Sequence, residues 1–171
     1  MRLFIGVRPS EEFQTALSAL QDRLRAAGVT GRFLEPANLH MTLAFIGEWP
    51  EDVTEFLPEV KKPFEIALSH IGVFTDADVL WAGIAPCEAL DVLARRIRHI
   101  LADAAIPFDR KAFSPHFTLA RKPSVPKYVT LSEIEVPHAV MTVDTVSLFR
   151  SDHVKSGMVY TVIGQSPCGD D

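Results

Sequence analysis

Two histidines and two threonines are spaced as a proton-transfer site requires. His40 and Thr42 are separated by one residue, and so are His116 and Thr118. On a β-strand alternate side chains share a face, so each pair would present an imidazole beside a hydroxyl. Both stretches continue as His-x-Thr-Leu-Ala. A His-x-Thr-Leu match arises by chance on the order of once in ten thousand positions, so its duplication indicates a shared role.

The chemistry that suits two such pairs is displacement at phosphorus. Histidine is the only side chain whose ordinary pKa, about 6.5, lets it both accept and donate a proton near neutrality. In-line displacement needs both actions, because the nucleophile loses a proton while the leaving oxygen gains one. The threonine hydroxyls can donate hydrogen bonds to the non-bridging phosphate oxygens. This site would need neither a metal nor any other cofactor.

Two less specific interpretations compete with this one. A lone histidine on a strand is usually structural, but the duplicated neighbours favour a catalytic role. A zinc site is the second alternative, with His40 and His116 as two of its ligands. The sequence offers no obvious third ligand, since His70 follows the register of apolar residues and His99 lies on a polar helix face. Zinc therefore stays the weaker alternative.

Composition limits the class of protein. The 171 residues are 47% hydrophobic and 23% charged, which is typical of a globular chain with a substantial core. We expect one domain over residues 1–171. Nothing approaches the apolar length of a membrane span, and the first apolar run is too short for a signal peptide. The net charge of −5 argues against coating nucleic-acid backbones, but allows an enzyme that binds one phosphate at an RNA end.

The cysteines indicate a reducing compartment. Cys87 lies near an expected helix start and Cys168 in a polar tail, and they form no Cys-x-x-Cys pair. No disulfide framework is expected, and we predict a cytoplasmic protein.

The flanking sequence predicts the elements that must position the two motifs. In chain order we expect a strand over 2–8, a helix from Ser10 to Gly28, a connector over 31–36, the first motif strand over 38–47, and a short helix opened at 50–52 and closed before Pro63. We then expect a strand from Phe64 that turns at 75–78 into a partner over 79–84, a long helix from Glu88 to before Pro107, the second motif strand over 115–121, a loop over 122–127, and strands over 140–149 and 158–163 joined by a loop over 150–157.

These elements favour an α+β fold with mainly antiparallel sheets and flanking helices. Strands and helices follow no strict βαβ rhythm, and the sequence has no glycine-rich phosphate loop. Strict alternation places Phe45 in the core and Arg121 on the face opposite His116. Arg98 and its neighbouring arginines are expected on a solvated helix face.

At these motifs the chain resembles a known family. His40–Leu43 and His116–Leu119 look like the two signature tetrapeptides of the 2H phosphoesterase superfamily. The branch that they resemble most is that of the bacterial and archaeal RNA 2′,3′-cyclic phosphodiesterases, historically called 2′-5′ RNA ligases. The likeness runs nearly end to end, and Leu148–Ser151 resembles part of the closing hairpin. Phe33 stands where the family often has Trp, and Phe64–Ile106 carries no family signature.

The resemblance implies a two-lobed fold with pseudo-twofold symmetry and a central cleft. It implies hydrolysis of a 2′,3′-cyclic phosphate at an RNA end, or of a cyclic nucleotide, to a 2′-phosphate. His40 would be the general acid and His116 the general base, with Thr42 and Thr118 holding the phosphate. Arg121, followed by Lys122, would steer the anionic substrate. We expect a monomer without an obligate protein partner.

Three alternatives stay open. A catalytically idle module could bind RNA ends or nucleotides in the same cleft, although phosphate binding alone needs no matched acid and base. A 2H phosphoesterase could act on another ester, such as a 2′-5′ linkage or a cyclic ADP-ribose phosphate. The sequence also leaves open whether the protein has RNA ligase activity.

Overall fold

The computed structural model describes residues 1–167, which form an α+β fold, as predicted. Its strands are β1 (Arg2–Val7), β2 (Thr30–Phe33), β3 (Met41–Glu48), β4 (Phe64–Phe74), β5 (Val79–Ile84), β6 (His116–Ser124), β7 (Val140–Val143), β8 (Ser147–Val154) and β9 (Gly157–Gln165). The helices are α1 (Glu11–Ala27) and α2 (Glu88–Asp103), with short 3-10 helices at Pro36–Asn38, Thr54–Phe56 and Leu131–Glu133.

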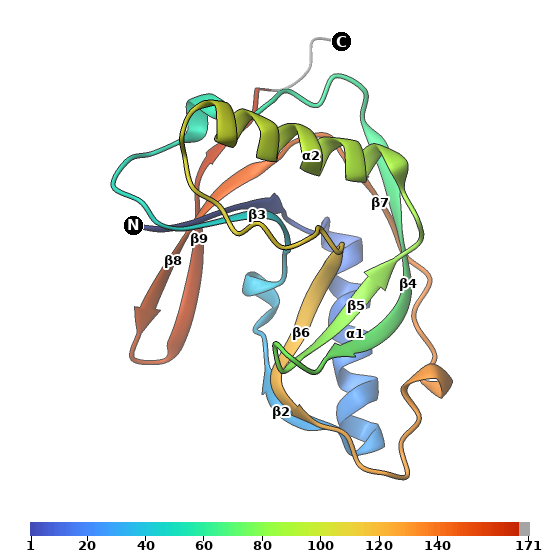
Figure 1. Cartoon of the computed structure of the whole chain (residues 1–171). Helices are drawn as coiled ribbons and strands as arrows, with labels where there is room; N and C mark the ends of the chain where they lie inside the picture. Colours follow the sequence, from blue (N-terminus) through green and yellow to red (C-terminus); the bar gives the residue numbers. More distant parts are fainter. Residues whose placement is uncertain (168–171) are drawn as a thin grey trace.

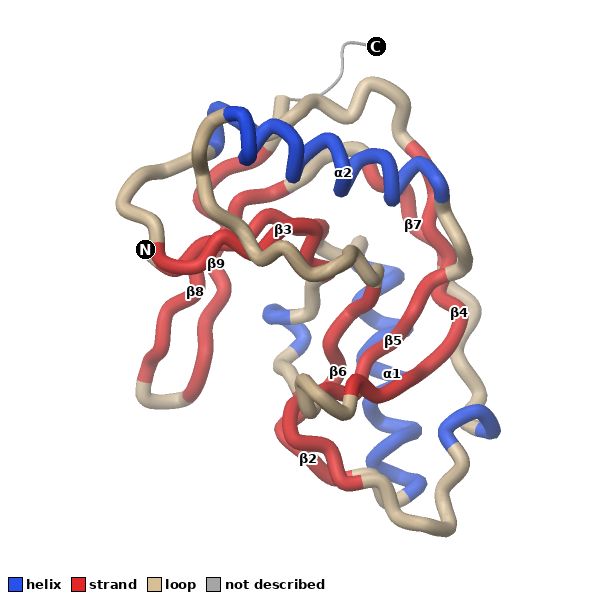
Figure 2. Tube along the Cα trace, in the orientation of Figure 1, coloured by secondary structure: helices blue, strands red, loops and turns tan. Residues whose placement is uncertain are grey.

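One curved antiparallel sheet organises the molecule (Figure 2). Its strand order is β7-β4-β5-β6-β3-β1-β8-β9, and β2 pairs with β6. The two motif strands, β3 and β6, are therefore neighbours at the middle of the sheet. They pair at Met41 and Phe117. Each motif belongs to one half of the sheet, and the halves meet where the motifs lie.

Each half is covered by one helix (Figure 1). Helix α1 packs on the β6 half, where the Phe13 ring lies 5.1 Å from that of Phe117. Its predicted caps are confirmed: the Ser10 hydroxyl accepts from the N–H of Phe13, and Gly28 takes the left-handed conformation with φ 106°. Helix α2 lies over the β3 half. The apolar stripes of both helices are buried in the core.

The helix predicted between 50 and 62 is absent. Only the 3-10 turn Thr54–Phe56 forms there. Pro58 explains the difference, because a proline ring disfavours helical geometry in the residue before it and removes an N–H donor. Val53 and Val60 are nevertheless buried, so the segment contributes to the core as an irregular loop.

Three further boundaries were predicted wrongly. The first half of the connector over 31–36 is strand β2, which pairs with β6, and β6 itself extends to Ser124. The single strand predicted over 140–149 is two strands: β7 pairs with β4, whereas β8 pairs with β1. The loop predicted over 150–157 is mostly strand, because β8 and β9 form a long hairpin. The β4–β5 hairpin is confirmed.

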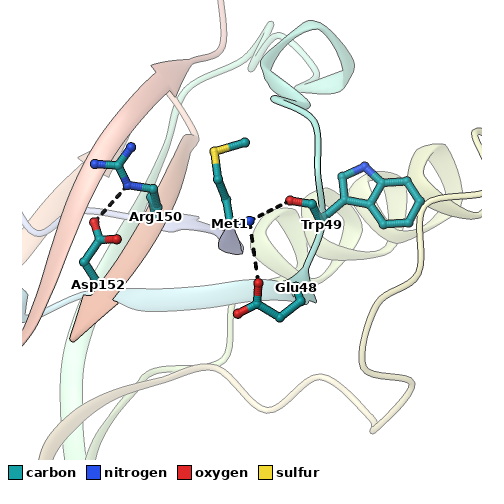
Figure 3. Close-up of polar contacts among 5 residues, drawn as sticks. All are labelled: Met1, Glu48, Trp49, Arg150 and Asp152. Carbon is teal, nitrogen blue, oxygen red and sulfur yellow. Dashed lines mark hydrogen bonds and ion pairs between the residues drawn. The ribbon is translucent and has the colours of Figure 1, made fainter.

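Polar contacts join the start of β1 to the end of β3, and a further contact lies on the neighbouring strand β8 (Figure 3). The Met1 ammonium donates to the carbonyl of Trp49 at 3.0 Å and lies 3.6 Å from a carboxylate oxygen of Glu48. On β8 the Arg150 Nε donates to Asp152 at 2.8 Å. These contacts are exposed or only partly buried, so they contribute little free energy individually.

Two sequence expectations concern compartment and membrane. Among residues 1–167 the structure has no helix long and apolar enough to cross a membrane. Cys87 is partly exposed at the start of α2, whereas Cys168 lies outside the described residues. The absence of a disulfide therefore stays a prediction.

Candidate active site

A cleft opens where β3 and β6 meet. Its main part has a volume of about 530 Å³ and is lined by all five predicted site residues, which are His40, Thr42, His116, Thr118 and Arg121. A smaller pocket of about 240 Å³ adjoins it on the β8–β9 side, sharing three of these residues and adding Phe4, Met158 and Tyr160. The structure thus brings together side chains that the chain keeps far apart in sequence.

His40 is held by backbone and aromatic contacts. Its Nδ1 lies 2.7 Å from the carbonyl oxygen of Asn38. A carbonyl only accepts, so Nδ1 carries the proton and Nε2 is the atom left for chemistry. Nε2 lies 3.1 Å from the hydroxyl of Thr42, which donates to it when the ring is neutral. The rings of Phe4 and Tyr160 enclose the imidazole, with centroids 4.6 and 5.0 Å away.

This enclosure makes protonation of His40 costly. Burial lowers its pKa from 6.5 to about 4. The positive charges of Arg121 and protonated His116 act in the same direction, whereas the hydrogen bond to Asn38 opposes them. In this environment the imidazole of His40 is therefore neutral at neutral pH.

His116 repeats the arrangement in a more open place. Its Nδ1 lies 2.6 Å from the carbonyl oxygen of Ser114, again two residues earlier in the chain. The ring meets the edges of Phe74 and Trp81, with centroids 5.0 and 6.4 Å away. Burial lowers the pKa of His116 below 6.5, opposed by the Ser114 bond and reinforced by the charge of Arg121. In both histidines Nδ1 thus donates to a backbone carbonyl, which fixes the same tautomer.

A β-bulge follows the threonine in each motif. On β3 the pairs Gly6–Thr42 and Ile5–Ala44 leave Leu43 as the extra residue. On β6 the pairs Trp81–Thr118 and Leu80–Ala120 leave Leu119 as the extra residue. A bulge inserts one residue and reverses the alternation beyond it. The same irregularity therefore occupies the same motif position twice.

The bulges overturn two predictions from strict alternation. Phe45 was expected in the core, yet it is partly exposed and lines the cleft beside Thr42. Arg121 was expected on the face opposite His116, yet it lines the cleft with that histidine. These two residues occupy equivalent positions, two after each bulge. Lys122 has φ 50° and is exposed outside the lining of either part of the cleft.

With this geometry established, comparison with known proteins identifies the family. The family model described as LigT like Phosphoesterase matches residues 7–81 and 83–160, nearly the whole chain and both motifs. The chain belongs to the LigT-like phosphoesterase family.

Curated relatives of this phosphoesterase have one name in common. A protein of Aquifex aeolicus named RNA 2′,3′-cyclic phosphodiesterase is 30% identical over 95% of each chain. A protein of the same name from Thermus thermophilus is 33% identical over 95% of this chain and 88% of its own length. Another from Methanothermobacter thermautotrophicus is 30% identical over 94% of this chain and 95% of its own.

Solved structures share the fold. The protein TT0787 of Thermus thermophilus superimposes with a TM-score of 0.76 at 30% identity, covering all of both chains. Apo LigT of E. coli has a TM-score of 0.80 at 23% identity, covering 99% of this chain and 98% of its own. The two-lobed LigT-like architecture expected from the motifs is thus the observed one.

Asn38 is a site residue that sequence reasoning missed. Its backbone carbonyl accepts from His40, while its side chain joins the β8–β9 hairpin. The amide Nδ2 donates to the carbonyl of Met158 at 2.8 Å, and the N–H of Tyr160 donates to Oδ1 at 3.3 Å. Asparagine at the head of the motif was visible, but a partner about 120 residues away gives no local signal.

Arg98 corrects the prediction of a uniformly solvated arginine face on α2. It is partly buried, lines the cleft and donates to the carbonyls of Leu43 and Lys111, at 3.2 and 2.6 Å. Its neighbours Arg95 and Arg96 are exposed, as predicted.

The zinc alternative gains no ligand from the fold. Within residues 1–167 no group of three or more His, Cys, Asp or Glu side chains is placed to hold a metal ion. His40 and His116 therefore lack a third protein ligand there, whereas four to five contacts are usual for a bound zinc.

Proposed function

We propose that this LigT-like phosphoesterase hydrolyses 2′,3′-cyclic phosphates at RNA ends, or on nucleosides, to 2′-phosphates without a metal ion. The observation that carries the proposal is the pair of imidazoles in one cleft, each held by a hydrogen bond from Nδ1 to a backbone carbonyl. The curated relatives named RNA 2′,3′-cyclic phosphodiesterase support the choice of ester.

The proposed reaction is a single in-line displacement. His116 Nε2 takes a proton from water as the water oxygen bonds to phosphorus. The bond from phosphorus to the 3′ oxygen breaks, and His40 Nε2–H gives its proton to that oxygen. One water is consumed, a 2′-phosphomonoester and a 3′-hydroxyl are formed, and the two histidines exchange protonation states. Solvent then returns them to the starting state.

The remaining cleft residues are assigned to the phosphate. Thr42 and Thr118 donate hydrogen bonds to its non-bridging oxygens, and Arg121 supplies a positive charge beside them. The Thr42 hydroxyl contacts His40 Nε2 in the empty cleft. Binding of phosphate gives that hydroxyl a charged acceptor and releases Nε2 for the leaving oxygen.

Substrate binding also raises the proton affinity of His40, which then takes a proton from solvent. With a pKa of about 4, His40 is a poor reservoir of protons at neutral pH in the empty cleft. A phosphate anion within a few ångströms favours the charged imidazolium and raises that pKa. His40 therefore becomes protonated when the anion binds, and without the anion it is neutral.

The test is product analysis with a substrate panel in excess EDTA. The panel contains nucleoside 2′,3′-cyclic phosphates, 2′,3′-cyclic-ended oligonucleotides, a 2′-5′-linked dinucleotide and a cyclic ADP-ribose phosphate, with products separated as 2′- and 3′-phosphates. We expect 2′-phosphates from the 2′,3′-cyclic esters at an undiminished rate. If the protein turned over only the other esters, the proposed 2′,3′-cyclic substrate would be wrong. Activity abolished by EDTA and restored by zinc would make the histidines ligands.

A binding experiment separates the non-catalytic alternative. An idle module would bind cyclic-ended oligonucleotides without releasing product, and replacing either histidine would leave its affinity nearly unchanged. The cytoplasmic location, the monomeric state and the absence of an obligate partner stay predictions from sequence.

A further inference from the structure

The carbonyls of the two bulge residues each receive a side chain from a helix. On β3 the carbonyl oxygen of Leu43 accepts from Arg98 Nε at 3.2 Å. On β6 the carbonyl oxygen of Leu119 accepts from Gln21 Nε2 at 3.0 Å. Both donors come from the helix that covers that half of the sheet. The bulge that redirects each motif is thus tied to its own helix.

The two donors occupy equivalent places in the fold. Gln21 lies ten residues after Glu11, the first residue of α1, and Arg98 lies ten residues after Glu88, the first residue of α2. Each therefore stands at the same turn of its helix and reaches the same motif position. Two unlike side chains, an amide and a guanidinium, make the same contact in both halves.

Each of these side chains joins two backbone segments, and that of Gln21 is fully buried. Gln21 is only 2% exposed, and the same Nε2 also donates to the carbonyl of Leu34 at 3.0 Å. Arg98 bridges the carbonyls of Leu43 and Lys111. An unpaired buried donor or acceptor is costly, so each side chain holds two backbone segments in one geometry.

The position of the held carbonyl has a consequence for the site. It belongs to the residue directly after the motif threonine and two residues before Phe45 or Arg121. A bulge with a loose carbonyl could relax to a regular register, and every side chain beyond it would then change face. The contact therefore helps to set the direction of two side chains, the motif threonine and the cleft residue that follows the bulge.

We propose that Gln21 and Arg98 are paired positioning residues, each fixing the bulge of one motif so that its threonine and second cleft residue face the phosphate. The proposal rests on the proposed function, since the phosphate is what these groups face. Neither side chain is assigned a proton or a bond to the reacting atoms.

Methionine variants remove the donors and keep an unbranched stem. Gln21→Met and Arg98→Met should lower kcat about 10- to 100-fold with KM changed less than threefold, because misplacement by about an ångström costs rates of that size. The loss should be smaller for Gln21, since the Leu119 carbonyl keeps a bond from the N–H of Leu34 at 3.0 Å. Losses confined to KM would overturn the proposal.

Matched controls come from the same helices. Arg23 and Arg96 are exposed and donate to the carbonyls of Glu135 and Glu59, away from both motifs. Arg23→Met and Arg96→Met should keep kcat within twofold. Arg98→Lys separates charge from geometry: it keeps the cation but cannot span both carbonyls, so kcat should recover only partly. Full recovery in Arg98→Lys, together with a KM whose dependence on salt is weaker in Arg98→Met than in the wild type, would make Arg98 a direct phosphate contact.

Double-mutant cycles test the assignment to halves. Gln21→Met should be strongly non-additive with Thr118→Ala and nearly additive with Thr42→Ala. Arg98→Met should show the reverse preference, because a helper and the group it positions lose one shared contribution. General destabilisation cannot produce this crossed pattern. Additivity in all four cycles, or equal coupling in all four, would overturn the proposal.

A readout without turnover keeps this test independent of the proposed reaction. In the absence of substrate, methyl NMR signals should move for Thr118 but not Thr42 in Gln21→Met, and for Thr42 but not Thr118 in Arg98→Met. If the wild type hydrolyses no cyclic phosphate but the signals move in this way, the proposed function fails and the positioning role stands. A Gln21→Met variant that moves the Thr42 signal alone, or an Arg98→Met variant with the Thr42 signal unmoved, would overturn the proposal.

Discussion

The two halves of the cleft share a backbone design but differ in their surroundings. Each has a histidine tied to the carbonyl two residues earlier, a threonine, a bulge and a helix donor to that bulge. Around His40 lie the rings of Phe4, Phe149 and Tyr160, whereas His116 lies against Phe74 and Trp81 in a more open wall. The duplicated motif therefore sets geometry, and the unduplicated neighbours set proton affinity.

The residues after the bulges show the same division. Motif two places the guanidinium of Arg121 directly in the cleft. Motif one places an aromatic ring at the equivalent position, and the Arg2 guanidinium lies 4.9 Å from the centroid of that Phe45 ring. Each half thus places a guanidinium at the position after its bulge, one from the motif strand itself and one from β1 through a cation–π contact.

The largest expected effect comes from removing either histidine. His40→Ala and His116→Ala should each lower kcat roughly 100- to 10,000-fold on a 2′,3′-cyclic-ended oligonucleotide, the range of general acid–base assistance. The matched control is His99→Ala, an exposed histidine on α2, which should stay within twofold. Near-full turnover in either site variant would show that the replaced histidine takes no part in the proton transfers.

The leaving group distinguishes the two roles. A phosphodiester that releases nitrophenolate needs no proton on its leaving oxygen, so it should restore His40→Ala far more than His116→Ala. Measuring the ratio of rates on the two substrate classes for both variants assigns the acid. Preferential recovery of His116→Ala would exchange the two roles.

The dependence of stability on pH should next reveal the burial of His40 in its half of the cleft. Folding lowers the pKa of His40 from 6.5 to about 4, so the unfolded chain binds more protons between these values. The free energy of unfolding is therefore unaffected by this group above about pH 6.5. It falls as pH falls toward 4, by up to roughly 3 kcal/mol at 1.36 kcal/mol per pKa unit. Urea unfolding across this window should show the loss in the wild type and a reduced slope in His40→Gln. An unchanged slope would contradict the burial argument.

Removal of the cation from motif two should have a smaller effect. Arg121→Met should lower kcat/KM about 10- to 100-fold, since it removes a charge beside the phosphate. It should also raise the pKa of both histidines, because Arg121 lowers both. The acid limb of kcat/KM should therefore move to higher pH. A limb that stays in place would show that Arg121 does not act on the histidines.

Tyr160→Phe should have the smallest effect. The Tyr160 hydroxyl accepts from Arg121 Nη2 at a long 3.5 Å, while its ring encloses His40. Loss of the hydroxyl alone should cost kcat/KM only a few-fold, whereas Tyr160→Ala should raise the pKa of His40 by opening its wall. An effect of Tyr160→Phe as large as that of Arg121→Met would give the hydroxyl a role of its own.

The sequence predicted the parts of this site that depend on residue type and local period. The motif pairs, the caps of α1 and the β4–β5 hairpin all carry signals within a few residues. The bulges carry none, because Leu43 and Leu119 look like ordinary core residues of an alternating strand. Phe45 and Arg121 were consequently assigned to the wrong faces.

Other errors arose from contacts across the fold. Arg98 sits in a run of helix arginines, and only the tertiary structure shows that it meets the carbonyl of Leu43. Asn38 finds its partners on β9, far along the chain. In contrast, the missing helix after residue 50 had a local cause in Pro58, which the apolar spacing concealed.

The most direct test of the central claim, that both halves serve one displacement, is kcat of the double variant His40→Ala/His116→Ala. It should be measured beside both single variants on one 2′,3′-cyclic-ended oligonucleotide. An acid and a base that act in the same transition state lose most of their joint contribution when either is removed. The double variant should therefore turn over close to the slower single variant. Losses that multiply would show that the two histidines contribute to catalysis independently of each other, contrary to this account.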